Sequence, residues 1–121
     1  WENKPHLLQM PEGESMEGFQ QRVVSAVMRI LEKEAGKNIL IVTHGTVIRV
    51  LLCRFKELPL EDMVKIPWCD NTAITAGIWE NGKFHIEAEG DCSHLDDEMS
   101  TFKNQEWYFE YRKKFFESKN E

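Results

Sequence analysis

The chain has 121 residues, of which 41% are hydrophobic and 30% charged, as in a folded globular domain and unlike a disordered chain. Its net charge of -6, with no run of lysines or arginines, argues against nucleic acid or an anionic membrane surface as the main partner. Three widely spaced cysteines, with no C-x-x-C pair, favour a reducing compartment over a disulfide framework. We therefore expect a cytoplasmic protein with a single domain over residues 1–121 and no membrane segment.

The amino-terminal region predicts an extended segment followed by a long helix. Residues 1–13 are polar and carry the breakers Pro5, Pro11 and Gly13. Ser15 suits a helix N-cap, and Gly36 ends a run of apolar residues at helical spacing. That run consists of Phe19, Val23, Val24, Val27, Met28, Ile30 and Leu31. The pattern predicts one long helix with a single apolar face.

A short apolar run comes next and ends in a histidine. Residues 39–42 are all aliphatic, and Thr43, His44 and Gly45 follow directly. An uninterrupted apolar run of this length indicates a strand covered on both faces, as in parallel sheets. Residues 46–55 continue as a largely buried helix, so His44 is expected at the carboxyl end of a strand, where α/β proteins commonly bind anions.

The second half of the chain predicts a hairpin and a terminal helix. Pro59 marks the entry to a short helix. Residues 72–80 and 84–88 flank Asn81-Gly82, the strongest two-residue hairpin signal. Aromatic residues at spacings of three, four and seven predict an amphipathic helix over residues 104–118.

His44 is the leading candidate for chemistry. A lone histidine after a strand is equally compatible with a hydrogen-bonded structural role. The neighbouring residues are therefore needed to distinguish a functional role from a structural one. Gly45 lets backbone approach a ligand, Thr46 offers a hydroxyl and an N–H at the helix start, and Arg49 lies one turn further on. Imidazolium, amide and guanidinium together suit a phosphoryl oxygen, although Arg49 also fits a helix-surface or ion-pair arginine.

The remaining polar candidates have weaker functional signals. Glu14 lies just before a helix N-terminus with Arg22 two turns on, which predicts a structural ion pair. Asn71 either borders the substrate site or serves as a turn residue. Cys92 and His94 form a C-x-H pair without the paired ligand spacing that zinc requires, so we expect no metal.

Several of these motifs together resemble a known family. Pro11-Glu-Gly-Glu-Ser15, Arg22-Val23, the stretch ILIVTHGTVIR at 39–49, NTAIT at 71–75 and Ser93-His94-Leu95 are similar, in order and spacing, to the second half of the histidine phosphatase superfamily, the phosphoglycerate mutase-like branch. The resemblance implies a three-layer α/β/α fold with a mixed, mostly parallel sheet, incomplete in this chain.

The resemblance also implies a phosphohistidine mechanism that needs no metal or other cofactor. The family's nucleophile lies in an R-H-G triplet near the amino terminus, and a glutamate before a W-E-G segment is the proton donor. No R-H-G triplet occurs in residues 1–121. His44 matches the family's second histidine, which contacts the transferring phosphoryl group, and Gly45, Thr46 and Asn71 would bind phosphate or substrate.

The implied activity is phosphomonoester hydrolysis, with mutase-type transfer less favoured because the chain lacks inserted segments around His44. The implied partners are a small phosphorylated substrate, together with a missing amino-terminal half or a second copy in a homodimer. The fragment alone is expected to be inactive. The alternative is a noncatalytic module of the same fold that binds a phospho-ligand or a protein.

Overall fold

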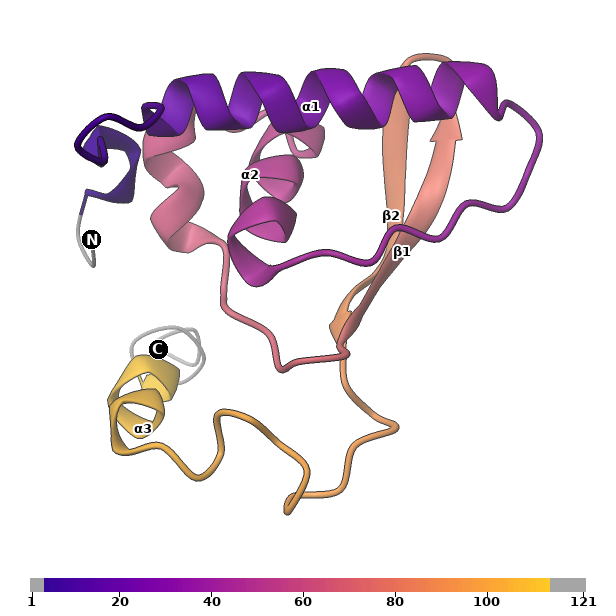
Figure 1. Ribbon diagram of the computed structural model, residues 1–121. Coiled ribbons are helices and arrows are strands. Elements are labelled where there is room, and N and C mark those ends of the chain that lie inside the picture. Colours follow the sequence, from indigo (N-terminus) through magenta and orange to yellow (C-terminus); the bar gives the residue numbers. More distant parts are fainter. Residues whose placement is uncertain (1–3, 114–121) are drawn as a thin grey trace. The chain divides into compact units, whose positions relative to one another are not determined.

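The computed structural model describes residues 4–113 as helices and one small antiparallel sheet (Figure 1). The elements in chain order are η1 (Pro5–Leu7), α1 (Met16–Lys33), α2 (Gly45–Phe55), η2 (Leu60–Lys65), β1 (Ile74–Glu80), β2 (Lys83–Asp91) and α3 (Glu106–Arg112). They fall into two compact units: residues up to 66 with the hairpin tip 79–84, and residues 67–78 with those from 85 onward. The single-domain assignment over 1–121 stays a prediction.

Helix α1 begins where the sequence predicts. The Ser15 hydroxyl accepts a hydrogen bond from the backbone N–H of Gly18 at 3.1 Å, which satisfies one of the free donors of the first turn. Met16, Val23 and Val27 lie on one face of the helix and are buried. The predicted amphipathic helix is therefore confirmed.

The core of the first unit lies where α1 crosses α2 (Figure 1). Its buried members are Met16, Val23, Val27, Val50, Leu51, Cys53 and Met63. η2 packs against α2, which confirms the short helix predicted after Pro59. The hairpin tip extends this core, because the ring of Phe84 stacks on Phe55 with centroids 4.6 Å apart. Helix α2 is thus covered by several neighbours.

The segment before α2 departs from the prediction. Residues 39–43 form neither a strand nor a bridge within the described chain, and the sheet that the structure does contain has β1 and β2 as its two strands. Leu40 is 88% exposed and Val42 87% exposed. The prediction of a buried parallel strand is wrong for this chain, because a strand is buried only when neighbouring strands and helices cover it.

The hairpin is confirmed. β1 and β2 pair through a turn in which Asn81 and Gly82 have φ angles of 51° and 77°, as a two-residue hairpin turn requires. Side chains of β2 alternate regularly between exposed and half-buried, the pattern of a strand with one face covered.

The predicted terminal helix is confirmed in part: α3 spans Glu106–Arg112, and the predicted residues from 114 onward lie outside the described residues. The amino-terminal segment is less extended than predicted, because Pro5 lies buried in the 3-10 turn η1. η1 packs against α1 and η2, which explains that burial. Among the described residues, no helix combines the length and hydropathy needed to cross a membrane.

Candidate functional site

His44 is the N-cap of α2. Its backbone is extended, with φ −114° and ψ 158°, and its carbonyl accepts the N–H of Ile48 at 3.1 Å. The imidazole makes no capping hydrogen bond within the described chain, and the residue is exposed. A side chain that leaves the helix end uncapped and faces solvent is available to a ligand.

The first turn of α2 adds backbone donors beside His44. Gly45 and Thr46 begin the helix, so their N–H groups have no carbonyl partner one turn earlier in the helix. The first turn, all of whose residues the structure describes, carries no acidic side chain. The partial positive charge of the helix end is therefore not offset locally, an arrangement that favours an anion.

Buried contacts hold α2 in place behind this end. Val50 is fully buried, and its carbonyl accepts a hydrogen bond from the Gln20 side chain of α1 at 3.0 Å. Cys53 is also buried, and its thiol donates to the carbonyl of Pro59 at 3.1 Å. Burial, more than the nearby charges of Asp62 and Glu61, raises the pKa of this thiol.

Arg49 has a structural role that the sequence did not reveal. Its guanidinium is buried and donates from Nε to the carbonyl of Ile66 at 2.9 Å and from Nη2 to the carbonyl of Met63 at 2.8 Å. The helix-surface alternative is wrong, because the residue is buried and these bonds hold its guanidinium against η2. The ion-pair and phosphate-contact alternatives stay predictions. No sequence motif marks a backbone carbonyl as an arginine partner, so only the tertiary structure could identify it.

Asn71 belongs to the second unit. It is exposed in a turn closed by the hydrogen bond from Ala73 N–H to Asp70 carbonyl at 3.1 Å. Thr72 in this turn has a φ of 66°, which is rare for a β-branched residue. The turn reading of Asn71 is confirmed, whereas its place beside His44 in one substrate site stays a prediction.

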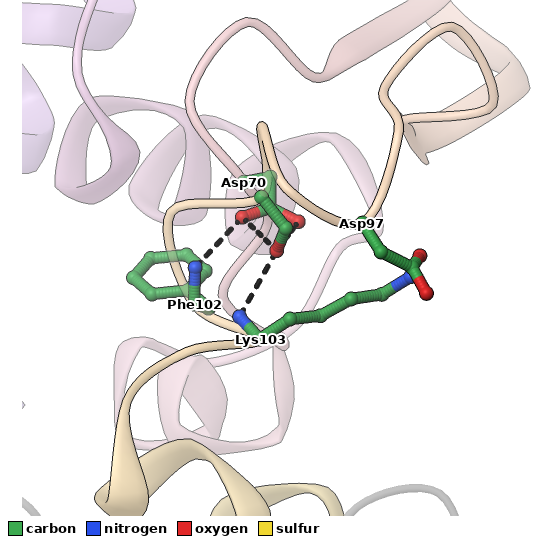
Figure 2. A network of polar contacts seen from close by, with 5 residues as sticks. Asp70, Asp97, Phe102 and Lys103 are labelled. Carbon is green, nitrogen blue, oxygen red and sulfur yellow. Dashed lines mark hydrogen bonds and ion pairs between the residues drawn. The ribbon is translucent and has the colours of Figure 1, made fainter.

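Asp70, the residue before Asn71, is held in place by hydrogen bonds to its carboxylate (Figure 2). Asp70 accepts hydrogen bonds from the Ser100 hydroxyl at 2.9 and 3.0 Å and from the Phe102 N–H at 3.0 Å. The Ser100 hydroxyl in turn accepts the N–H of Lys103 at 3.0 Å, and the Lys103 ammonium pairs with Asp97. This network ties two loops of the second unit together.

The predicted ion pair at the start of α1 is confirmed. Arg22 donates to Glu14 from Nε at 3.1 Å and from Nη2 at 2.5 Å, and its guanidinium lies 5.4 Å from the centroid of the Phe19 ring. The hydrogen bonds from Arg22, together with its charge, lower the pKa of Glu14. Glu14 therefore acts as a structural carboxylate in this chain.

The described residues contain no group of three or more ligating His, Cys, Asp or Glu side chains. Instead, the ring of His94 lies within hydrogen-bond distance of the Thr72 hydroxyl, at 3.3 Å. Cys69 packs close to Gly90, where an added Cβ would lie 3.0 Å from Cys69 Cβ, and burial raises the pKa of its thiol.

Similarity to other proteins indicates the family of this chain. Residues 1–91 match the model of the histidine phosphatase superfamily, branch 1. The chain belongs to this superfamily. Similar proteins include phosphoglycerate mutase-like protein 4 of Arabidopsis thaliana, 34% identical over 86 residues, which cover 70% of this chain and 36% of that protein. A probable phosphoglycerate mutase, GpmB of Klebsiella pneumoniae, is 31% identical over 91 residues, which cover 72% of this chain and 42% of GpmB.

A solved structure gives the same result for the fold. YhfR of Bacillus stearothermophilus superposes with a TM-score of 0.72 and 37% identity, over 78% of this chain and 46% of YhfR. This confirms an α/β fold of the phosphoglycerate mutase type, of which the described residues contain the two-stranded antiparallel sheet. The chain thus spans less than half the length of these relatives.

Proposed function

We propose that this chain is the part of a phosphomonoester phosphatase that holds the transferring phosphoryl group, with His44 as its principal contact. The observation that carries the proposal is the uncapped, exposed His44 at the N-terminus of α2, beside the Gly45 and Thr46 N–H groups. An imidazole and a helix N-terminus together place hydrogen-bond donors where a phosphoryl oxygen carries negative charge.

The proposed reaction has two steps, and the nucleophile lies on a segment with R-H-G, which residues 1–121 do not contain. A histidine nitrogen forms a bond to phosphorus while the ester P–O bond breaks, and the leaving alcohol takes a proton from a carboxylic acid. Water then attacks phosphorus while the carboxylate formed in the first step takes up its proton, the P–N bond breaks, and inorganic phosphate leaves. Such covalent catalysis divides one difficult displacement into two, and His44 stabilises the charge on the equatorial oxygens in both.

Hydrolysis is favoured over transfer between two sites of a substrate. A mutase must retain the phosphoenzyme and present the intermediate to it again, which calls for additional segments around the site. Between the end of α1 at Lys33 and the start of η2 at Leu60, the chain contains a connection, α2 and a brief loop, with no further helix or strand. Sugar phosphates, nucleotides and phosphorylated cofactor precursors all carry the phosphomonoester that the site would contact.

Binding can be tested directly on the 121-residue chain. In a titration with inorganic phosphate followed by NMR, we expect the amide signals of Gly45 and Thr46 to shift, with a dissociation constant in the range of about 1 mM or weaker. The His44→Ala variant should lose this response, and Asn71→Ala serves as the test of the second predicted contact. Shifts spread evenly over the chain, or unchanged in His44→Ala, would contradict the proposed phosphate contact.

Turnover requires the R-H-G segment, supplied by joining the amino-terminal part of a family member that carries it ahead of residue 1. With p-nitrophenyl phosphate as substrate, His44→Ala should lower kcat by about a hundredfold to a thousandfold, the usual loss for one preorganised donor. The circular dichroism spectrum should not change, because His44 is exposed. A protein that binds phosphate through His44 but forms no acid-labile phosphoenzyme would favour the noncatalytic binding module instead.

A further inference from the structure

The turn that carries Asn71 is anchored at the residue before it. Both oxygens of the Asp70 carboxylate lie within hydrogen-bond distance of the Ser100 hydroxyl, and one of them also accepts the Phe102 N–H (Figure 2). Ser100 is 6% exposed, so its hydroxyl is shielded from water, and hydrogen bonds to a carboxylate are stronger than those between neutral groups. Asn71 is itself exposed and takes part in none of these bonds.

A second anchor holds the same stretch of backbone two residues earlier. The backbone N–H of Trp68 donates to the Tyr111 hydroxyl of α3 at 2.6 Å. The ring of Tyr111 stacks on Tyr108, and that of Tyr108 on Phe102, with centroids 5.9 and 5.3 Å apart. Because the Phe102 N–H also donates to Asp70, this aromatic stack joins the two anchors.

Both anchors come from residues 100–111, which we call the carboxy-terminal clamp. The clamp and the turn belong to the same compact unit, and 30 to 43 positions separate the residues that they bond. The match to the family model ends at residue 91, so the clamp lies beyond the part of the chain that the model matches. The clamp thus ties a later segment of the chain to the turn that carries a predicted ligand contact.

The turn needs this support because its backbone is strained. Thr72 has a φ of 66°, a left-handed conformation that is unfavourable for a β-branched residue and persists only where its surroundings hold it. The carbonyl of Asp70 accepts the N–H of Ala73 and closes the turn, and the carboxylate of the same residue receives the clamp. Without the clamp the turn can relax, and the Asn71 side chain moves with it.

We propose that Ser100 and Tyr111 are positioning residues, which hold the Asn71 amide ready for contact with a phosphorylated substrate. The inference rests on the proposed function, in which Asn71 is a predicted contact to phosphate or substrate. An amide that is already held in place binds an anion more tightly than one that must first be ordered, because binding then loses less conformational entropy. Loss of either clamp contact should therefore weaken phosphate binding through Asn71.

A titration of the 121-residue chain with inorganic phosphate tests the proposal, with the backbone amides of residues 71 and 72 followed by NMR. Tyr111→Phe removes the acceptor of the Trp68 N–H, and Ser100→Ala removes the hydroxyl donor to the carboxylate. Each should raise the Kd for phosphate about threefold to tenfold, the range for one lost hydrogen bond. Tyr108→Phe is the matched control, because it makes the same change one turn earlier on α3, and it should leave the Kd unchanged.

A double-mutant cycle separates positioning from general packing. Asn71→Ala should raise the Kd at least as much as Ser100→Ala, and the double variant should bind no more weakly than Asn71→Ala alone, because the clamp acts through Asn71. Additive losses would mean that Ser100 acts elsewhere and would overturn the proposal, as would an unchanged Kd in both clamp variants. If Ser100→Ala unfolds the second unit, Tyr111→Phe, which keeps the aromatic ring, takes its place in the cycle.

The amide signals of Gly45 and Thr46 distinguish failure of this proposal from failure of the proposed function. A phosphate response there that His44→Ala abolishes, together with an unchanged Kd in Asn71→Ala, would support the contact at His44 and refute the clamp. A response at residues 71 and 72 that Tyr111→Phe weakens, without one at Gly45 and Thr46, would support the clamp and count against His44. No phosphate response anywhere in the chain would overturn both.

Discussion

Residues 39–43 and helix α2 follow one another in the chain and are both rich in aliphatic side chains, yet only the helix is buried. Val42 is 87% exposed, whereas Val50, eight positions later, is 0% exposed. The helix satisfies its own backbone and needs only a cover for one face, which α1, η2 and the hairpin tip supply. A strand needs neighbouring strands for its backbone and a cover for both faces, and within the described residues 39–43 pair with no strand and leave Leu40 and Val42 exposed.

The largest effect on stability is expected at Arg49. Its substitution measures how much the packing of α2 depends on the hydrogen bonds of one buried guanidinium. Arg49→Ala should cost about 3 kcal/mol of unfolding free energy, because it removes the guanidinium donor to the Ile66 carbonyl, one of the two donors to the Met63 carbonyl, and buried side-chain volume. Urea unfolding followed by circular dichroism measures this. Lysine lacks the guanidinium fork and should restore the loss only in part.

The control for this prediction is on the same helix. Arg54 is exposed, so Arg54→Ala should change the unfolding free energy by no more than about 0.5 kcal/mol. If Arg49→Ala were as mild as Arg54→Ala, the two carbonyl bonds would not anchor α2.

Val42 and Val50 allow the same substitution to be compared in residues 39–43 and in helix α2. Val50→Ala should destabilise the chain by about 2 kcal/mol, through lost apolar burial and the cavity left behind. Val42→Ala removes the same atoms from an exposed site and should stay within about 0.5 kcal/mol. Thermal or urea unfolding of the isolated chain checks both variants, and similar losses at the two positions would mean that residues 39–43 are buried after all.

The smallest effect is expected at the surface pair of Glu14 and Arg22. Arg22 lowers the pKa of Glu14 below its ordinary value of 4.5 in the folded chain, first through hydrogen bonds and then through its charge. The pair therefore stabilises the fold at pH values above about 4.5, and this contribution disappears as pH falls through the lowered pKa. Solvent screens the pair, so the effect is small.

A double-mutant cycle isolates this contribution. Glu14→Gln and Arg22→Gln, measured singly and together by thermal unfolding over a range of acid to neutral pH, should be non-additive near neutral pH, and the coupling should fall as pH drops through the lowered pKa of Glu14. Coupling that persists after NMR shows the Glu14 carboxylate to be protonated would contradict an origin in the charged carboxylate.

Local signals in the sequence predicted the elements that the chain completes by itself. Ser15 caps α1 through a donor three residues away, and Asn81-Gly82 turns a hairpin between adjacent strands, so both follow from neighbouring residues. The length of the apolar run predicted a strand at 39–43. Such a run indicates that a segment is suited to a buried strand, but it does not show whether other segments pair with it. For the same reason, the sequence did not predict the structural neighbours of Arg49, because a local pattern does not identify tertiary partners.

The candidate site was predictable to a similar degree. The motif around His44 located the histidine at a helix N-terminus, and the structure has it there, exposed and uncapped. The carbonyl partners of Arg49 and the carboxylate network of Asp70 depend on residues 14 to 32 positions away, which spacing does not encode. Family resemblance supplied the expected roles of Gly45, Thr46 and Asn71, which phosphate binding must now test.

Residue-resolved hydrogen exchange of the isolated chain in dilute solution tests the central contrast most directly. Amides of residues 39–43 should exchange at nearly the rate of an unstructured chain, while those of Val50, Leu51, Leu52 and Cys53 in α2 should be strongly protected. Protection of residues 39–43 equal to that of α2, at concentrations where the chain is monomeric, would contradict the account.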